Sequence, residues 1–264
     1  MERFINKITC GDNCDLLGLL PRECIDLVVT SPPYDDLRTY GGHTWDFYGV
    51  AWQLKRVLKP GGVIVWVVND ATINGSETGS SFEQALFFKR IGLNLHDTMI
   101  WDKPFIVPRP SNRYESSAEY MFVLSKGTPK TVNLIKDKKN VGSGRKITGH
   151  KRGSDGEPEY LHGATAGKLV SEWGTRHNVW PIDASRGNNG HNHPAPFPER
   201  LAQDHIVSWS NPGDVVLDPF SGSGTTAKAA KELERKYIGF EINPAYCNIG
   251  EARTAQEVLS FATV

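Results

Sequence analysis

Residues 215–226 read Val-Val-Leu-Asp-Pro-Phe-Ser-Gly-Ser-Gly-Thr-Thr, a β-branched run that opens into a glycine-rich turn. From Thr225 onward the residues favour a helix. Glycines between a strand and a helix let a ligand approach the backbone closely. The stretch therefore predicts a strand, a loop and a helix that hold a cofactor, with an ordinary tight turn as the alternative.

An acidic residue, Glu241, ends the next apolar segment, which begins at Tyr237. A carboxylate about twenty residues past a glycine-rich loop accepts hydrogen bonds from ribose hydroxyls in Rossmann-like units. The loop has neither the Gly-Lys-Ser/Thr of a P-loop nor a Gly-x-Gly-x-x-Gly pattern, which disfavours ATP hydrolysis and NAD binding. A different nucleoside-containing cofactor is predicted.

The chain around this unit alternates between strand and helix patterns. Apolar runs predict strands at 25–30, 63–68, 97–101, 119–124, 215–217 and 237–241, and a short strand begins at Lys7. Three- and four-residue apolar spacing predicts helices at 48–58, 82–91, 198–209 and 225–235 and from Pro244 onward. Such alternation indicates an α/β domain in which helices cover both faces of a largely parallel sheet.

Composition places the chain among globular proteins. Of its 264 residues, 39% are hydrophobic and 23% are charged, which excludes a fibrous or wholly disordered chain. We find no apolar run of membrane-spanning length and no secretory pattern, so we expect a cytoplasmic protein with no membrane partner. The four cysteines form no Cys-x-x-Cys pair, and we expect neither a metal site nor a disulfide framework.

Local charge, rather than net charge, carries information here. Lysine and arginine total 30 and are balanced by 30 acidic residues. Residues 126–152, however, contain nine lysines and arginines and one acidic residue, and glycine and polar residues continue to about Asn192. This middle segment reads as an irregular insertion that can neutralise phosphates, with a solvated loop as the alternative.

A second motif, Ser31-Pro32-Pro33-Tyr34, follows the strand predicted at 25–30. Two consecutive prolines stop both a strand ladder and a helix, so the loop has a fixed shape. Ligands gather at the carboxyl ends of strands in open α/β sheets. Tyr34 offers a stacking face with a polar tip, and the motif is a candidate reaction centre.

The two motifs together, Ser-Pro-Pro-Tyr first and Asp-Pro-Phe-Ser-Gly-Ser-Gly-Thr-Thr last, resemble the amino-group DNA methyltransferases that use S-adenosylmethionine. Their order is similar to that of the β group, a circular permutation of the common methyltransferase fold. Further matches are Gly11-Asp12, 56–62, Trp101-Asp102-Lys103, Glu119-Tyr120 and 193–201. The resemblance spans nearly the whole chain except the middle insertion.

The resemblance implies a Rossmann-like, class I S-adenosylmethionine-dependent methyltransferase fold, circularly permuted, with a mostly parallel seven-stranded sheet. Residues 1–104 would form the catalytic part, 105–190 a target-recognition insertion, and 191–264 the part of the same domain that binds S-adenosylmethionine.

The chemistry fits such a loop, because the exocyclic amine of cytosine or adenine has a lone pair delocalised into the ring. We expect Ser31 and the Pro32 carbonyl to accept hydrogen bonds from the amine and direct that pair toward the methyl group. Pro33 fixes the loop, and Tyr34 stacks on an extruded base. No Pro-Cys nucleophile is present, which disfavours methylation at cytosine C5.

Carried onto this chain, the family pattern assigns Asp12 to the adenine amino group and Glu241 to the ribose. Asp218 would border the methionine end. The remaining cofactor residues implied lie in the glycine-rich loop: Phe220, Ser221, Gly222, Gly224 and Thr225. Structural alternatives stay open, since Asp12 can cap a helix, Phe220 can be core and Asp218 can cap its turn.

Serine at the first position of the catalytic loop is typical of cytosine-N4 enzymes, as is the string from His193 to Pro198, whereas adenine-N6 enzymes usually carry Asp or Asn. Cytosine N4 is favoured and adenine N6 stays open. The residues expected to contact double-stranded DNA are Arg113, Lys138, Lys139, Arg145, Lys146, Lys151 and Arg152, with Arg109, Asn188 and Asn189 as additions.

Two other classes of function compete. Some proteins of related fold with a Pro-Pro-Tyr loop methylate RNA or a protein glutamine, although they usually show Asn before the prolines and the opposite motif order. A DNA-binding regulator built on a decayed methyltransferase is the non-enzymatic alternative. The resemblance also leaves room for a cognate restriction endonuclease, a homodimer and a bacterial or phage source.

Overall fold

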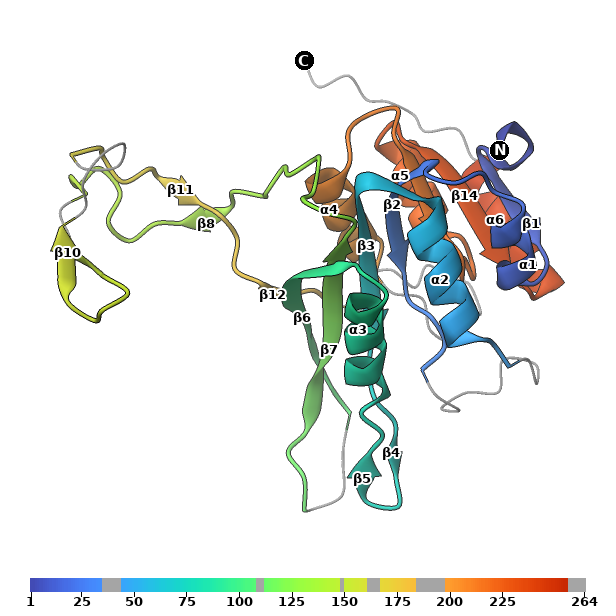
Figure 1. The fold of residues 1–264 in the computed structure, drawn as a ribbon, viewed down its shortest axis with the longest axis horizontal. Coiled ribbons are helices and arrows are strands. Elements are labelled where there is room, and N and C mark those ends of the chain that lie inside the picture. The colour runs from blue at the N-terminus through green and yellow to red at the C-terminus, as the bar shows by residue number, and fades with distance from the viewer. Residues whose placement is uncertain (35–43, 108–111, 148–149, 161–166, 184–197, 256–264) are drawn as a thin grey trace. The chain divides into compact units, whose positions relative to one another are not determined.

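The computed structural model describes residues 1–34, 44–107, 112–147, 150–160, 167–183 and 198–255 (Figure 1). It forms two compact units: residues 1–133 with 178–264, and residues 134–177. The larger unit contains both sequence motifs. The smaller unit lies inside the segment predicted to be the insertion.

The larger unit is built on one eight-stranded sheet in the order β1-β14-β13-β2-β3-β7-β6-β12. The strands are β1 (Lys7–Cys10), β14 (Lys236–Glu241), β13 (Val215–Asp218), β2 (Ile25–Thr30), β3 (Leu58–Val68), β7 (Ser116–Ser125), β6 (Asn94–Val107) and β12 (Val179–Pro181). Only β7 runs antiparallel to its neighbours, β3 and β6. The predicted α/β class and mostly parallel sheet are confirmed.

The sheet has one strand more than predicted, because β12 pairs in parallel with β6 at its edge. Three residues with no long apolar run gave no strand signal in the sequence. Other differences are at element ends: β6 and β7 are longer than predicted, and β3 begins at Leu58, where we expected a helix to end. Pairing of Leu58 with Ile25 extends that strand.

Helices cover both faces of the sheet. On one face, α1 (Asn13–Gly18), α2 (Phe47–Val57) and α3 (Ser80–Arg90) share a core cluster with Ile64 and Trp66 of β3. On the other, α4 (Glu199–Trp209) and α5 (Thr225–Glu232) pack with Val63 and Val65. Successive side chains of a strand point to opposite faces, so the unbroken apolar run at 63–68 supplies both cores.

Two further elements flank this core. The last helix, α6 (Pro244–Ala255), packs against β1 and α5. A small hairpin of β4 (Thr72–Ile73) and β5 (Ser76–Glu77) follows β3. None of the helices in the described ranges has the length and apolar character needed to cross a bilayer.

The smaller unit contains two short antiparallel pairs. β8 (Lys138–Lys139) pairs with β11 (Trp173–Gly174), and β9 (His150–Arg152) pairs with β10 (Pro158–Tyr160). The compact unit at 134–177 is narrower than the 105–190 segment named from the sequence, since the end of β6 and all of β7 and β12 belong to the main sheet. Target recognition by this unit stays a prediction.

Replacing Trp66 tests the first core cluster. Its ring is fully buried against Phe88 at 5.2 Å between centroids, and its indole N–H donates to Gln84 Oε1 at 2.8 Å. We expect Trp66→Ala to lower the free energy of unfolding by about 3 to 5 kcal/mol in urea denaturation, because it leaves a cavity and an unpaired amide. Trp52→Ala, at a 54% exposed position, is the control and should cost far less; equal losses would contradict this core assignment.

Candidate active site

The predicted catalytic and cofactor motifs meet at one edge of the sheet. Thr30, Asp218 and Glu241 are the last residues of β2, β13 and β14, three neighbouring parallel strands. The carboxyl ends of parallel strands lie at the same edge, where open α/β sheets bind ligands. β1 adds Gly11 here, whose N–H donates to the Glu241 carbonyl at 2.9 Å.

A buried hydrogen bond joins the two motifs. Thr30 Oγ1 donates to Asp218 Oδ1 at 2.6 Å, and the Phe220 N–H donates to the same oxygen at 3.1 Å. Asp218 therefore caps its turn, as the structural alternative predicted, and also holds the strand that leads into Ser31. Thr30 was not among the predicted site residues, because its partner is 188 residues away along the chain.

Burial raises the pKa of Asp218 from about 3.8 to about 6, although the hydrogen bonds from Thr30 and the Phe220 N–H favour the charged form. Nearby Glu241 also raises it. Two carboxylates close enough for one to act on the other favour a ligand with positive charge.

The predicted catalytic motif is held by a contact with a distant strand, β7. Ser31 Oγ and Tyr34 OH lie 2.9 Å apart, and Tyr34 OH donates to Glu119 Oε2 on β7 at 2.7 Å. Pro32 is buried, and Pro33 is half-buried. The structure thus joins Ser31 to Tyr34 by a contact that the sequence did not predict, and Glu119 was noted from the sequence only as a family match.

Glu241 holds the glycine-rich loop that was predicted to bind the cofactor. Its Oε2 accepts the Gly222 N–H and its Oε1 accepts the Asn243 N–H, both at 2.8 Å. A carboxylate has about four acceptor positions, so two further donors, such as ribose hydroxyls, can bind there.

Asp12 is the N-cap of α1. Its Oδ1 accepts from the N–H groups of Cys14 at 2.8 Å and Asp15 at 3.1 Å, so the capping alternative is confirmed. A contact with adenine remains a prediction. The neighbouring Asn13, which we did not single out, donates from Nδ2 to the Pro219 carbonyl at 3.2 Å and ties this turn to the cofactor loop.

Aromatic rings line the same region. Phe220 is partly buried, with its ring centroid 4.8 Å from Trp45 and 6.3 Å from Trp66. Phe220 is therefore partly a core residue, which was the structural alternative to cofactor binding. Trp45 gave no signal in the sequence, because it precedes α2 and reaches Phe220 only through the fold.

The other loop residues have structural contacts. Gly224 has φ of +80°, and a Cβ there would come within 3.0 Å of the Gly250 Cα in α6. Ser221 is buried, and its Oγ has no hydrogen-bond partner among the described residues. Thr225 Oγ1 lies 3.5 Å from the Arg253 guanidinium. Close helix packing thus explains Gly224 at least as directly as ligand approach does.

Of the residues predicted to bind DNA, Arg109, Asn188 and Asn189 lie outside the described residues, and the others fall in both units. Arg113, in the larger unit, donates to the Gly75 carbonyl and pairs with Glu77 at 3.7 Å. In the smaller unit are Lys138 and Lys139 in β8, Lys151 and Arg152 in β9, and Arg145 and Lys146 between them. That unit carries nine lysines and arginines and five acidic residues, so its excess of positive charge is smaller than 126–152 alone indicated.

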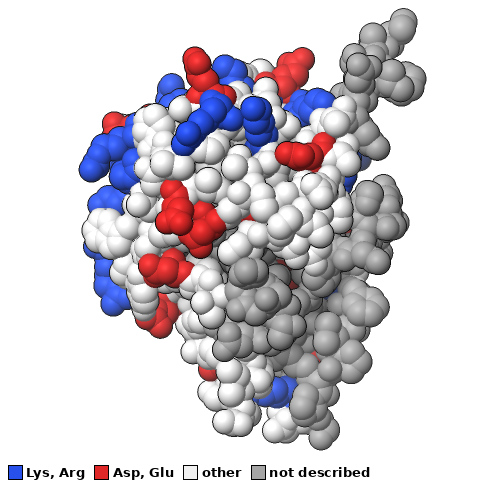
Figure 2. Space-filling view, turned by 90° about the vertical axis from the view of Figure 1, so that its right-hand side faces the viewer, with Lys and Arg blue, Asp and Glu red and all other residues white. Residues whose placement is uncertain are grey.

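Charge on the face drawn in Figure 2 is mixed. Lysine and arginine lie mainly along the upper and left margins among acidic residues, and the centre is largely uncharged. The described atoms of this face therefore gather no single sign of charge.

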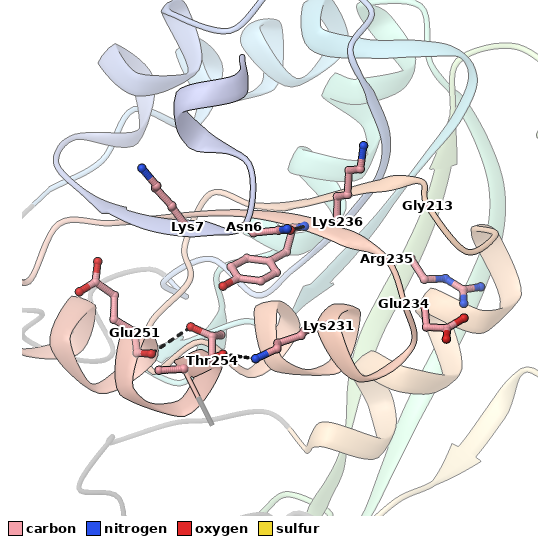
Figure 3. Close-up of a pocket in the computed structure, with 11 residues that line it drawn as sticks. Asn6, Lys7, Gly213, Lys231, Glu234, Arg235, Lys236, Glu251 and Thr254 are labelled. Carbon is pink, nitrogen blue, oxygen red and sulfur yellow. Dashed lines mark hydrogen bonds between the residues drawn. The ribbon is translucent and has the colours of Figure 1, made fainter. Parts of the chain in front are cut away.

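A surface pocket of about 630 Å³ lies away from the motifs (Figure 3). Lys7 and Lys236, which line it, begin β1 and β14, whereas Glu241 ends β14. The pocket therefore lies at the amino ends of these strands, opposite the carboxyl ends where the two motifs meet. Lys231 and Thr254 in its wall are bonded to each other, Nζ to carbonyl at 2.6 Å.

Comparison with known proteins defines the class. A family model described as DNA methylase, of the N6/N4 type, matches residues 25–252. The orphan methyltransferase M.BamHII of Bacillus amyloliquefaciens is 53% identical over 89% of this chain and 90% of its own length. The DNA adenine methyltransferase YhdJ of Escherichia coli is 28% identical over 95% and 84%.

Solved structures agree with this result. A putative DNA modification methylase of Thermus thermophilus, complexed with S-adenosyl-L-methionine, has a TM-score of 0.65 and 26% identity and covers 97% of both chains. The cytosine-N4-specific PvuII DNA methyltransferase shares the fold, with a TM-score of 0.66 and 24% identity over 95% of this chain and 86% of its own.

The fold is that of the class I methyltransferases, as the resemblance implied. The chain belongs to the N6/N4 family of DNA methylases, and it is an amino-type DNA methyltransferase that uses S-adenosylmethionine. The described site fits that cofactor, since Asp218 and Glu241 suit a molecule with sulfonium and ammonium charges and a ribose. When bound, the cofactor supplies the methyl group.

The raised pKa of Asp218 predicts a pH-dependent stability difference. The folded protein takes up this proton at higher pH than the unfolded chain, so the cost of burying the charge is present above about pH 6 and is relieved toward pH 4. Between about pH 7.5 and about pH 4, wild type should therefore gain about 2 to 3 kcal/mol of unfolding free energy relative to Asp218→Asn. Urea denaturation at both pH values measures this, and a pH-independent difference would contradict the assignment.

Proposed function

We propose that the protein methylates the exocyclic N4 of cytosine within a specific sequence of double-stranded DNA. The observation that carries the proposal is the placement of Ser31, at the first position of the catalytic loop, beside the cofactor loop. Thr30, directly before Ser31, is bonded to Asp218, directly before Pro219 and Phe220. The methyl donor and the target amine would therefore meet above β2 and β13.

In this proposal the protein's own groups position the reaction. Ser31 Oγ and the Pro32 carbonyl accept hydrogen bonds from the amine, which directs its lone pair toward the methyl group. Pro33 fixes the loop and Tyr34 stacks on the extruded base. The base amine is the nucleophile, and no covalent bond to the enzyme forms.

The same proposal assigns cofactor contacts. Glu241 accepts from the ribose hydroxyls with the lone pairs that its two backbone partners leave. Asp12 faces the adenine amino group, and Asp218 lies toward the methionine end. The Phe220 ring packs on the nucleoside beside Trp45, while Ser221, Gly222, Gly224 and Thr225 shape the loop.

The smaller unit would contact DNA. Its cations, Lys138, Lys139, Arg145, Lys146, Lys151 and Arg152, would neutralise phosphates, and Arg113 would assist from the larger unit. We assign the target-recognition role to this unit on its position in the chain and its excess of cations. A cognate endonuclease and a homodimer stay predictions.

Nucleoside mass spectrometry tests the proposed function. Wild-type protein is incubated with unmethylated DNA and methyl-labelled S-adenosylmethionine, and the DNA is digested. We expect labelled N4-methylcytosine. Labelled N6-methyladenine would retain the mechanism and overturn the choice of base, and label found only in RNA or protein substrates would overturn DNA as the substrate.

Ser31→Ala in the same assay tests the mechanism. We expect kcat to fall by about 100-fold or more, because the amine loses an acceptor that orients it, while the Kd for S-adenosylmethionine changes little. Ser76→Ala, in the exposed β5 hairpin strand, is the matched control. Wild-type turnover by Ser31→Ala would remove Ser31 from the mechanism.

A further inference from the structure

A chain of four polar side chains runs from the sheet to the catalytic loop. Lys103 Nζ on β6 contacts Glu119 Oε1 on β7 at 2.5 Å. The other oxygen of Glu119 accepts from Tyr34 OH at 2.7 Å, and Tyr34 OH lies 2.9 Å from Ser31 Oγ. The reaction scheme above uses only the last two of these residues.

Strand pairing places Glu119, and a nearby ring contacts its partner Lys103. Glu119 is directly opposite Trp101 in the antiparallel β6–β7 pair, and Lys103 follows two residues later, just past Asp102, where the pairing register shifts. Glu119 is only 8% exposed. Lys103 Nζ also lies 5.3 Å from the Trp101 ring centroid. The carboxylate is thus presented to Tyr34 from a paired, largely buried position on β7.

The arrangement sets the direction of each hydrogen bond. An ionised carboxylate only accepts, and a phenol has one hydrogen, so Tyr34 gives its hydrogen to Glu119. The Ser31 hydroxyl must then be the donor in its bond with Tyr34. Its oxygen consequently keeps its lone pairs for other partners.

We propose that Glu119, held by Lys103, is a positioning residue that makes Ser31 a hydrogen-bond acceptor for the target amine. The inference rests on the proposed function, in which Ser31 meets the amine. It also adds a specificity: a Ser31 oxygen that can only accept favours bases with an amino group over bases with a carbonyl at the same position.

Glu119→Gln tests the direction of these hydrogen bonds, because it changes the side chain's hydrogen-bonding groups with almost no change in its shape. Lys103 is a donor, so the new amide oxygen faces Lys103 and the amide nitrogen faces Tyr34. Tyr34 then accepts from the amide and gives its hydrogen to Ser31, which occupies a lone pair needed for the amine. We expect kcat to fall by about 100-fold, with little change in the Kd for S-adenosylmethionine or the KM for DNA.

A double variant separates the effect of hydrogen-bond direction from the effect of losing the ion pair. In Lys103→Met combined with Glu119→Gln, the amide can turn its carbonyl oxygen toward Tyr34 and restore the original direction. We expect this double variant to recover at least about tenfold in kcat over Glu119→Gln alone. A structural ion pair would predict the opposite, because the double variant removes both partners.

The matched control is Glu23→Gln, which makes the same change in the Lys126–Glu23 pair, with 3.0 Å between Nζ and Oε1 and no part in the site. It should leave kcat unchanged. Wild-type kcat in Glu119→Gln, or a double variant no faster than Glu119→Gln, would overturn the inference while Ser31→Ala remains inactive. Full turnover by Ser31→Ala would instead overturn the proposed function itself.

Discussion

The hydrogen bond from Thr30 Oγ1 to Asp218 Oδ1 is the contact on which the site depends. It spans two neighbouring parallel strands at the point where each ends, and it is buried on both sides. One strand leads into the loop proposed to be catalytic and the other into the loop proposed to bind the cofactor. Because a buried carboxylate is costly without partners, the bond both satisfies Asp218 and fixes the spacing between the two loops.

Local signals explain how much of the fold could be predicted. The apolar run at 63–68 and the punctuation by Pro32, Pro33 and the loop glycines are short-range features, and they correctly gave an α/β sheet with both motifs at strand ends. The added edge strand β12 could not be predicted, because its three residues become a strand only by pairing with β6.

The contacts that support the site were missed for a related reason. Glu119 reaches Tyr34 across 85 residues of chain, and Trp45 reaches Phe220 only after α2 packs on the sheet. Neither contact leaves a periodic or spacing signal. Asp12 is the opposite case: its contact is local, and its capping of α1 was predicted from the sequence as an alternative. The proposed acceptor role of Ser31 therefore rests on two kinds of observation: a motif that the sequence shows and a strand pairing that only the structure shows.

Thr30→Val tests most directly whether one buried bond couples the two loops. Valine keeps the shape and removes the hydroxyl, so Asp218 loses its side-chain donor from β2. Calorimetry with S-adenosylmethionine and a single-turnover methylation assay should both show losses of about tenfold or more relative to wild type, and Thr72→Val in the exposed β4 strand should show neither. Wild-type affinity and wild-type turnover in Thr30→Val would contradict the account.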